Sequence, residues 1–198
     1  MKILHIDSAT TGAHSVTREL SAAIVDHLKS KNPGAEVTVL DLGTMPLPHL
    51  DPVTTGAIRQ PAEQHTEDMK AAFPAERAVL DQFLASDIVV IGAPMYNFTI
   101  PSALKAWLDR LGVPGVTFGY SEAGPKGLAG GRRVIIASSR GGQYEFDGPS
   151  EHQETYLRDF FGFIGIDNLE FIRAEKIGFG PEVRAQAIAD AKEAIKSL

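Results

Sequence analysis

The sequence predicts an α/β fold in which a doubly wound, five-stranded parallel sheet carries helices on both faces. Short apolar segments alternate with segments of helical periodicity, and this alternation is repeated five times along the chain. The apolar segments also lack the polar alternation of a sheet that faces water on one side. The chain has 198 residues, which suits one domain with a substantial core, so we expect a single domain over residues 1–198.

The first half of the chain is expected to contain three strands and two helices. Residues 2–7 form a short apolar run typical of a buried strand, and Leu20, Ile24 and Leu28 recur at every fourth position of the helix that follows. Proline inside a helix removes a hydrogen bond, so Pro74 predicts a break or kink in the second helix. The expected elements are a strand at 2–7, a helix from Ser15 to the stop at 32–34, a strand at 36–42, a Pro-rich loop at 45–52, a helix at 62–85 and a strand at 87–92.

The second half continues the same alternation of helices and strands. Proline is tolerated in the first turn of a helix, so Pro101 predicts a helix start after the third strand. Residues 156–164 are apolar beyond a single helix stripe, which favours burial on a second side. The expected elements are a helix from Pro101 to about Arg110, a strand at 132–138, an aromatic-rich helix at 150–164, a strand at 168–174 and an amphipathic helix at 181–197.

Composition argues against several classes of function. The formal net charge of −6 disfavours nucleic acid and anionic membranes as partners, because both bind basic surfaces. The chain contains no cysteine, which excludes disulfides, thiolate catalysis, iron–sulfur clusters and cysteine-ligated zinc. The six histidines do not cluster, so we expect no metal. We also expect a cytoplasmic protein without a membrane span, because the sequence has neither a secretion signal nor an apolar run of about 20 residues.

Three loops that directly follow predicted strands are expected to form one binding site. A doubly wound sheet binds its ligand outside the carboxyl ends of its strands. The loops after residues 7, 92 and 138 are therefore the places where binding residues are expected.

The first of these loops suits a phosphate. Residues 8–17 are rich in hydroxyl groups and small side chains, and they lead into a helix whose first N–H groups can bind an anion. Ser15 and Thr17 can add hydroxyl donors, although Ser15 is equally explained as a helix N-cap. Neither the Gly-x-Gly-x-x-Gly fingerprint nor a P-loop sequence is present, so a single phosphate ester fits better than a pyrophosphate or a nucleoside triphosphate.

The second and third loops suit a flat ring. In residues 92–101, aromatic side chains at Tyr96 and Phe98 flank Asn97 between prolines, so the loop can wall an apolar ring while its backbone meets polar edges. Core packing of the two aromatics is the alternative. Residues 138–142 end in two glycines, which allow a ligand to approach the backbone closely, although a Gly-Gly pair is also an ordinary turn signal.

Together these segments resemble the family of FMN-dependent NADH-azoreductases, which are also described as quinone reductases. The resemblance covers essentially the whole chain and depends most on the motifs APMYNF and SRGG. The motifs are APMYNF at residues 93–98, SRGG at 139–142, GVTF at 115–118 with Tyr120, Gly124-Pro125 and Gly127-Leu128, the turn Asp147-Gly148-Pro149, and residues 163–166 (FIGI).

The resemblance implies a fold, a cofactor and a reaction. It implies a flavodoxin-like sheet with strand order 2-1-3-4-5, non-covalent FMN, and NADH as the electron donor. It further implies a ping-pong reaction that reduces quinones and the azo bond of aromatic azo compounds. The family is homodimeric, and the neighbouring subunit completes each FMN pocket. We therefore expect Leu50–Gln60 to be a loop that reaches over the partner's site.

The resemblance also assigns residues to the FMN site. One position departs from the family, which often has a second serine after the first strand, where this chain has Ala9; its backbone or Ser8 would have to replace that hydroxyl. We also expect large aromatics to wall the substrate pocket, with core or dimer packing as the alternative. The expected cofactor-binding residues are Ala9, Ser15, Val16, Thr17, Met95, Tyr96, Asn97, Phe98, Ser139, Arg140, Gly141 and Gly142, and the substrate-pocket candidates are Phe118, Tyr120, Phe161 and Phe163.

Three other functions fit the sequence. An NAD(P)H:FMN reductase with a different natural acceptor shares every motif. A flavodoxin-like electron carrier would bind FMN without reacting with a nicotinamide, although such carriers are usually more acidic. A doubly wound domain that binds no flavin is the third alternative. The sequence favours NADH over NADPH only because no obvious basic pair marks a site for a 2′-phosphate.

Overall fold

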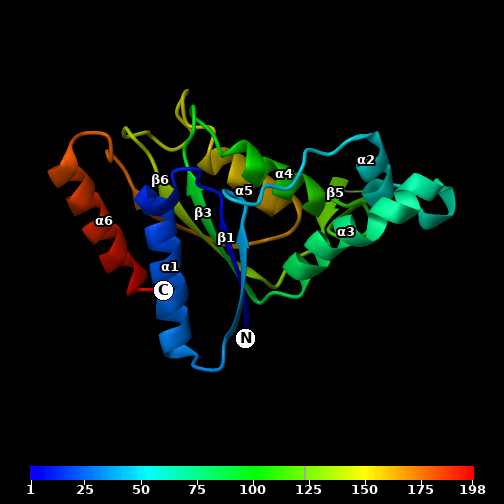
Figure 1. Ribbon diagram of the computed structural model, residues 1–198, viewed down its shortest axis with the longest axis horizontal. Coiled ribbons are helices and arrows are strands. Elements are labelled where there is room, and N and C mark those ends of the chain that lie inside the picture. The colour runs from blue at the N-terminus through cyan, green and yellow to red at the C-terminus, as the bar shows by residue number, and fades with distance from the viewer. Residues whose placement is uncertain (123) are drawn as a thin grey trace.

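The centre of the fold is a parallel sheet of five strands in the order β2-β1-β3-β6-β7 (Figure 1). The computed structural model describes residues 1–122 and 124–198. The observed order is the expected 2-1-3-4-5, so the flavodoxin-like, doubly wound sheet is confirmed. The strands are β1 (Lys2–Asp7), β2 (Glu36–Asp41), β3 (Ile88–Pro94), β6 (Arg133–Ser139) and β7 (Asn168–Ala174).

Helices cover both faces of the sheet and bury two separate apolar cores. Successive residues of a strand point to opposite faces, so Val89 and Ile91 of β3 belong to one core and Val90 to the other. α1 (Val16–Lys31) and α6 (Pro181–Ile195) pack on the face of Val90. α3 (Glu67–Leu84), α4 (Ser102–Leu111) and α5 (Glu154–Phe163) pack on the other face.

The segment after β2 is more helical than the sequence predicted. α2 (Pro52–Arg59) lies within the region expected to be a loop, and it begins with a capping box in which Asp51 and Thr54 bond to each other's backbone N–H groups. Short 3₁₀ turns, η1 (Gly12–His14) and η2 (Ala62–Gln64), precede α1 and α3. Because η2 occupies the start of the predicted 62–85 helix, α3 begins only after its own N-cap, Thr66.

Pro74 does not break α3, and in this respect the prediction was wrong. The helix continues through Pro74 from Glu67 to Leu84. A proline in a helix leaves the carbonyl four residues earlier without its usual donor. Here that carbonyl belongs to Lys70, and both residues are exposed, so water can take the place of the missing N–H.

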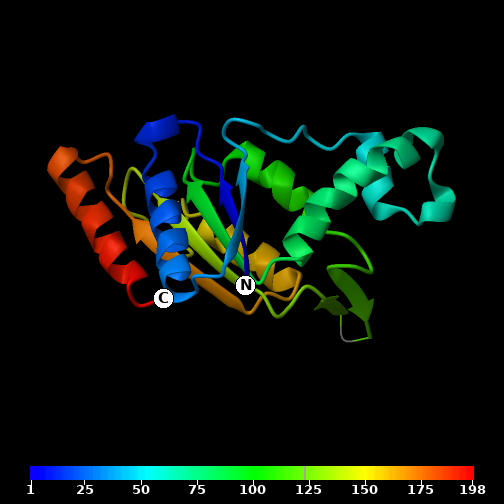
Figure 2. The same cartoon turned by 60° about the horizontal axis from the view of Figure 1, so that its bottom comes forward.

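A small antiparallel hairpin, not predicted from the sequence, projects beyond the sheet (Figure 2). It consists of β4 (Phe118–Ser121) and β5 (Gly124–Gly127). The hairpin is attached through Gly127, because the backbone around Ile164 and Gly165, just after α5, passes directly against it. Within the described residues, no helix is both long and apolar enough to cross a membrane.

We predict that Gly127→Ala destabilises the protein. A Cβ at this position would lie 2.2 Å from the backbone nitrogen of Gly165, so the hairpin or the end of α5 must move. Overpacking of this kind typically costs about 1–3 kcal/mol, which lowers the urea midpoint of unfolding. Gly119→Ala is the matched control on the paired strand, because its Cβ would meet only Leu128 Cδ1 at 3.6 Å. Equal midpoints for the two variants would contradict the proposed backbone contact.

Candidate functional site

The three predicted loops meet at the carboxyl edge of the sheet, which is the upper edge in Figure 1. They enclose a cavity of about 200 Å³. The β6–β7 side of the cavity is extended by the segment before α6 and by α6 itself. The cavity is lined by Thr11, His14, Ser15, Val16, Pro94, Met95, Tyr96, Ser139, Gly141, Ile177 and Arg184.

The first loop presents free N–H groups at the start of α1. Ser15 is the N-cap of this helix, and its hydroxyl accepts a hydrogen bond from the N–H of Arg18 at 3.2 Å. The hydroxyls of Ser15 and Thr17 are 3.1 Å apart. The backbone N–H groups of Val16 and Thr17 have no hydrogen-bond partner among residues 1–122 and 124–198. The N-cap role of Ser15 is therefore confirmed, and the first turn keeps donors for an anion.

Arg18 supports this loop from behind and does not supply a free charge to the cavity. Its guanidinium donates to the carbonyl of Ala9 at 3.2 Å, forms an ion pair with Asp41, and lies 3.5 Å from Asp7. The hydrogen bond to Asp41 raises the pKa of Arg18 and lowers the pKa of Asp41. Ser8 does not replace the serine that is absent at Ala9, because its buried hydroxyl donates to the carbonyl of Gly92 at 2.6 Å.

The second loop is a tight turn whose two central residues have positive φ. Asn97 (φ 48°) and Phe98 (φ 74°) lie between Tyr96 and Thr99, which exchange two backbone hydrogen bonds of 2.8 and 3.2 Å. Asparagine tolerates this conformation, but a bulky aromatic residue in it is strained. Phe98 is nevertheless half exposed and stands edge-on to the Tyr144 ring. The turn therefore holds an aromatic side chain outside the core beside the cavity.

Two hydrogen bonds connect this second loop to the other loops. The Tyr96 hydroxyl accepts the backbone N–H of Thr10 at 3.0 Å, which joins the second loop to the first. The backbone N–H of Met95 donates to the carbonyl of Ser139 at 2.8 Å, which joins the second loop to the third. The three strand ends are thus held together by direct contacts, and the cavity between them does not depend on α2 or the hairpin.

In the third loop, the glycines face outward and the arginine faces inward. The N–H groups of Gly141 and Gly142 have no partner within the described chain, and a Cβ on Gly141 would project into open space. The side chain of Arg140 is 2% exposed and points into the protein. Sequence analysis had expected Arg140 to border the ring. Its side chain cannot do so in this structure, so only its backbone remains near the cavity.

Arg140 is instead the centre of a buried ionic network. Its guanidinium donates to Glu151 at 3.1 Å, to Glu154 at 2.6 Å and to the Gln153 side chain at 3.2 Å. Gln153 also donates to the carbonyl of Ala93 at 2.8 Å, so one amide joins the end of β3 to the arginine that follows β6. These residues were not predicted from the sequence. The available signal was a run of acidic and amide side chains at the predicted start of α5.

Glu151 neutralises the start of α5 as well as Arg140. One of its carboxylate oxygens accepts the N–H groups of Gln153 and Glu154, and the other accepts the N–H and hydroxyl of Thr155. Burial taken alone raises the pKa of this carboxyl group. The hydrogen bonds from the helix and the positive charge of Arg140 outweigh burial, and the pKa of Glu151 falls below its usual value.

The four candidate substrate-pocket aromatics do not lie at this cavity within one chain. Phe161 of α5 is fully buried in the core of one chain, a position that fits the alternative of core packing. Phe118 is buried and packs on Phe163, with ring centroids 4.5 Å apart. Tyr120 of β4 is 80% exposed, and Phe163, the last residue of α5, is 38% exposed. These two remain available to another molecule.

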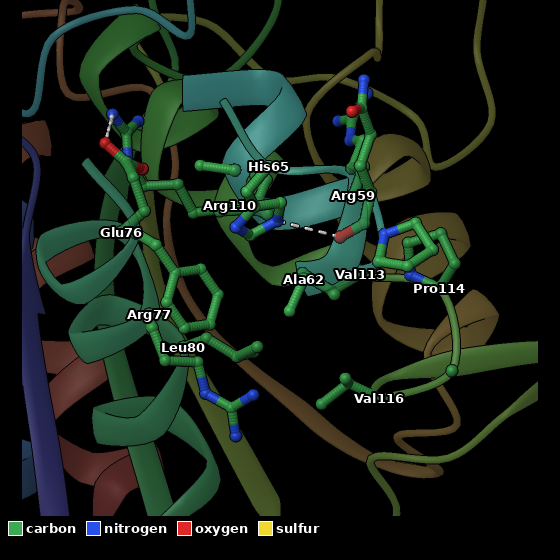
Figure 3. Close-up of a pocket in the computed structure, with 16 residues that line it drawn as sticks. Arg59, Ala62, His65, Glu76, Arg77, Leu80, Arg110, Val113, Pro114 and Val116 are labelled. Carbon is green, nitrogen blue, oxygen red and sulfur yellow. Dashed lines mark hydrogen bonds and ion pairs between the residues drawn. The ribbon is translucent and has the colours of Figure 1, made fainter. Parts of the chain in front are cut away.

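A second, larger cavity of about 440 Å³ lies away from the three loops (Figure 3). Its walls are mainly apolar side chains of α3 and of residues 113–116, such as Phe73, Leu80 and Val116. α2 and η2 close another side, where the His65 ring lies 3.1 Å from the carbonyl of Gln60. At its border, Arg110 and Glu76 form a buried ion pair of 2.6 Å. The cavity contains none of the loops that carry free N–H groups.

Metal ligation is not indicated in the part of the chain that the structure describes. No group of three or more histidine, aspartate or glutamate side chains is placed to hold an ion there. The acidic residues nearest the third loop are already paired with Arg140.

Comparisons with known proteins agree with this arrangement. The profile of a family described as having a flavodoxin-like fold matches residues 1–198. An FMN-dependent NADH:quinone oxidoreductase of Rhizobium meliloti is 54% identical over 200 residues, which cover 98% of this chain and 95% of that protein. A second protein of that name, from Bradyrhizobium diazoefficiens, is 53% identical and covers 100% of this chain and 98% of its own. The crystal structure of an FMN-dependent NADH-azoreductase from Bacillus anthracis in complex with FMN superposes with a TM-score of 0.86 at 26% identity, covering 99% of this chain and 98% of that chain.

We predict that Glu151→Gln destabilises the protein in a pH-dependent way. The pKa of Glu151 is lowered on folding, so its ionised form contributes stability above the unfolded pKa of about 4.3, and this contribution is lost as pH falls through the folded value. The variant lacks the charge, and we expect a loss of about 1–3 kcal/mol at pH 7 that shrinks at acidic pH. Urea unfolding at several pH values measures the difference, with the exposed Glu63→Gln as control. A loss that stays constant with pH would contradict the assignment.

Proposed function

The chain belongs to the flavodoxin-like family of FMN-dependent NADH:quinone oxidoreductases, and on this premise we propose that it transfers electrons from NADH through bound FMN to quinones and azo compounds. The observation that carries the proposal is the set of unpaired backbone N–H groups around one cavity. Val16 and Gly141 line this cavity, and the unpaired N–H groups of Thr17 and Gly142 belong to the residues that directly follow them. Such donors suit a ligand with an anionic tail and a polar ring edge.

The start of α1 is the proposed site of the FMN phosphate. The N–H groups of Val16 and Thr17 point out of the first turn of a 16-residue helix, whose dipole favours negative charge there. The hydroxyls of Ser15 and Thr17 can turn toward the same oxygens. Ala9 supports the site only through its backbone, because its carbonyl is the group that Arg18 holds in place.

The turns after β3 and β6 are the proposed site of the flavin ring. Bound FMN supplies hydride acceptance from NADH and hydride donation to the acceptor. Met95, Tyr96 and Phe98 would contact the ring and the ribityl chain with their side chains, and the Asn97 amide has no partner in residues 1–122 and 124–198. The N–H groups of Gly141 and Gly142 would donate to the ring edge on which negative charge develops, which is how preorganised donors favour a reaction.

We propose that the active form is a homodimer in which each subunit completes its partner's site. Tyr120 of β4 and Phe163 at the end of α5 are exposed, neither lines this chain's own cavity, and large aromatics on a surface are typical of interfaces. Both rings pack on the buried Phe118, with ring centroids 5.8 Å away for Tyr120 and 4.5 Å away for Phe163, which gives them a support. From the partner subunit, these rings would supply the wall against which a flat acceptor stacks.

The net charge of −6 supports the further proposal that neither nucleic acid nor an anionic membrane is a partner.

A quinone takes up two electrons and two protons to become a hydroquinone, so one NADH suffices. An azo bond needs two such rounds to yield two amines. Successive rounds at one exposed ring favour a ping-pong order, in which oxidised nicotinamide leaves before the acceptor enters.

We predict that the purified protein, loaded with FMN under anaerobic conditions, loses its visible flavin absorbance promptly on addition of NADH. Addition of a quinone then restores the absorbance. Double-reciprocal plots of initial rate against NADH concentration, measured at several fixed quinone concentrations, give parallel lines. Persistence of the yellow colour after NADH would instead identify an electron carrier and contradict the proposal. A panel of quinones, azo dyes and flavins with NADH and NADPH identifies the preferred acceptor and donor.

We predict that Tyr120→Ala and Asn97→Ala complement each other in a mixed dimer. If Tyr120 serves the partner's site, the subunit carrying Tyr120→Ala retains Asn97 and receives an intact Tyr120 from its partner. A heterodimer purified with two tags should then recover about half of the wild-type quinone reductase rate, whereas each homodimer stays well below that. If the residues act within one chain, neither subunit is intact, and the absence of recovery would overturn the shared site.

A further inference from the structure

The negative charge of an FMN phosphate has no free cation to balance it in the first loop of the proposed site. A phosphate monoester carries a charge of about −1.5 to −2 at neutral pH. The hydroxyls of Ser15 and Thr17 and the first N–H groups of α1 are neutral donors, and the helix dipole supplies only about half a positive charge. Arg18 is the nearest cation in sequence, but Asp7 and Asp41 already neutralise it. The first loop by itself therefore offers no free cation.

Arg184 is placed where such a cation is needed. It belongs to the first turn of α6, which packs beside α1 (Figure 1). It lines the same cavity as Ser15 and Val16. Its guanidinium donates one hydrogen bond, of 3.0 Å, to the carbonyl of His14, the residue that precedes the N-cap of α1. In residues 1–122 and 124–198, no carboxylate forms an ion pair with it. An arginine held at this point keeps further N–H donors for an anion.

Charge at the surrounding residues also points to Arg184. Among the residues that line the cavity, it is the only lysine or arginine, and no aspartate or glutamate lines it. The other nearby cation of α6, Lys192, is paired with Glu19 at 2.7 Å on the outer surface of α1. The cavity is thus free of competing negative charge, and an anion bound there would meet one partly buried guanidinium.

We propose that Arg184 is the charge partner of the FMN phosphate and sets the preference of the site for a phosphorylated flavin. This inference rests on the proposed function. Its bond to the His14 carbonyl preorients the guanidinium, so that little side-chain entropy is lost when the phosphate binds. Nothing in the motifs after β1, β3 and β6 indicated this residue, because it lies at the start of the last helix, far from them in sequence.

The test compares two ligands that differ only in the phosphate. Affinities of the apoprotein for FMN and for riboflavin are measured by quenching of flavin fluorescence at low ionic strength. Arg184→Gln should raise the FMN dissociation constant about tenfold, or ~1.4 kcal/mol, and leave the riboflavin constant within about twofold. Arg184→Lys keeps the charge and should recover part of the loss. Lys192→Gln removes the same charge from the same helix and should change neither constant.

The outcomes separate the two proposals. Failure of the wild-type protein to bind FMN would overturn the proposed function itself. If the wild type binds FMN, equal losses for FMN and riboflavin in Arg184→Gln would show that Arg184 acts only by holding the His14 backbone, and would overturn this inference. No loss for either ligand would overturn it as well. Added salt should reduce the preference for FMN over riboflavin more in the wild-type protein than in Arg184→Gln. This comparison tests the charge of Arg184 independently of any change that the substitution makes to the fold.

Discussion

The site depends first on the burial of Arg140 among carboxylates. This side chain follows β6, and it is bound by Glu151 and Glu154 at the start of α5 and, through Gln153, by the carbonyl of Ala93 at the end of β3. Glu154 also holds Arg173 of β7, so the network includes three strands and one helix at a single edge of the sheet. Complete truncation of one partner in such a buried network typically costs about 3–5 kcal/mol, more than the isosteric change of Glu151 to Gln, because it leaves the remaining charge uncompensated and removes the hydrogen bonds as well.

This arrangement separates the groups that stabilise the site from those that bind a ligand. Full charges lie behind the loops and neutralise one another, as Arg18 does with Asp7 and Asp41 beneath the first loop. In front of them, the cavity presents neutral backbone N–H groups whose positions are fixed by that support. Preorganised donors of this kind need no rearrangement when charge develops on a ligand. Arg184 is the exception, since no carboxylate within residues 1–122 and 124–198 pairs with it and it lines the cavity.

Sequence patterns were sufficient for the parts of the fold that depend on local periodicity. The five strands and the N-cap at Ser15 follow from apolar runs and cap chemistry, whereas the strand order was implied by the family resemblance. Tertiary contacts decided the rest. Pro74 is tolerated because it is exposed, and Phe161 is core because α5 lies on the sheet. The side chain of Arg140 points inward because it binds Glu151 and Glu154, and the sequence SRGG alone does not predict these partners. Each strand of the hairpin has only four residues, and β5 contains two glycines and a proline, so its contacts with residues after α5 are what define the hairpin.

The central claim is that donors from three strand ends bind one flavin in the smaller cavity. The most direct measurement is a crystal structure of the protein with FMN. The account predicts the phosphate against the N–H groups of Val16 and Thr17, the polar edge of the ring against Gly141 and Gly142, and Arg140 unmoved in its network. A flavin bound in the larger cavity between α2 and α3, or one whose phosphate lies away from α1, would contradict it.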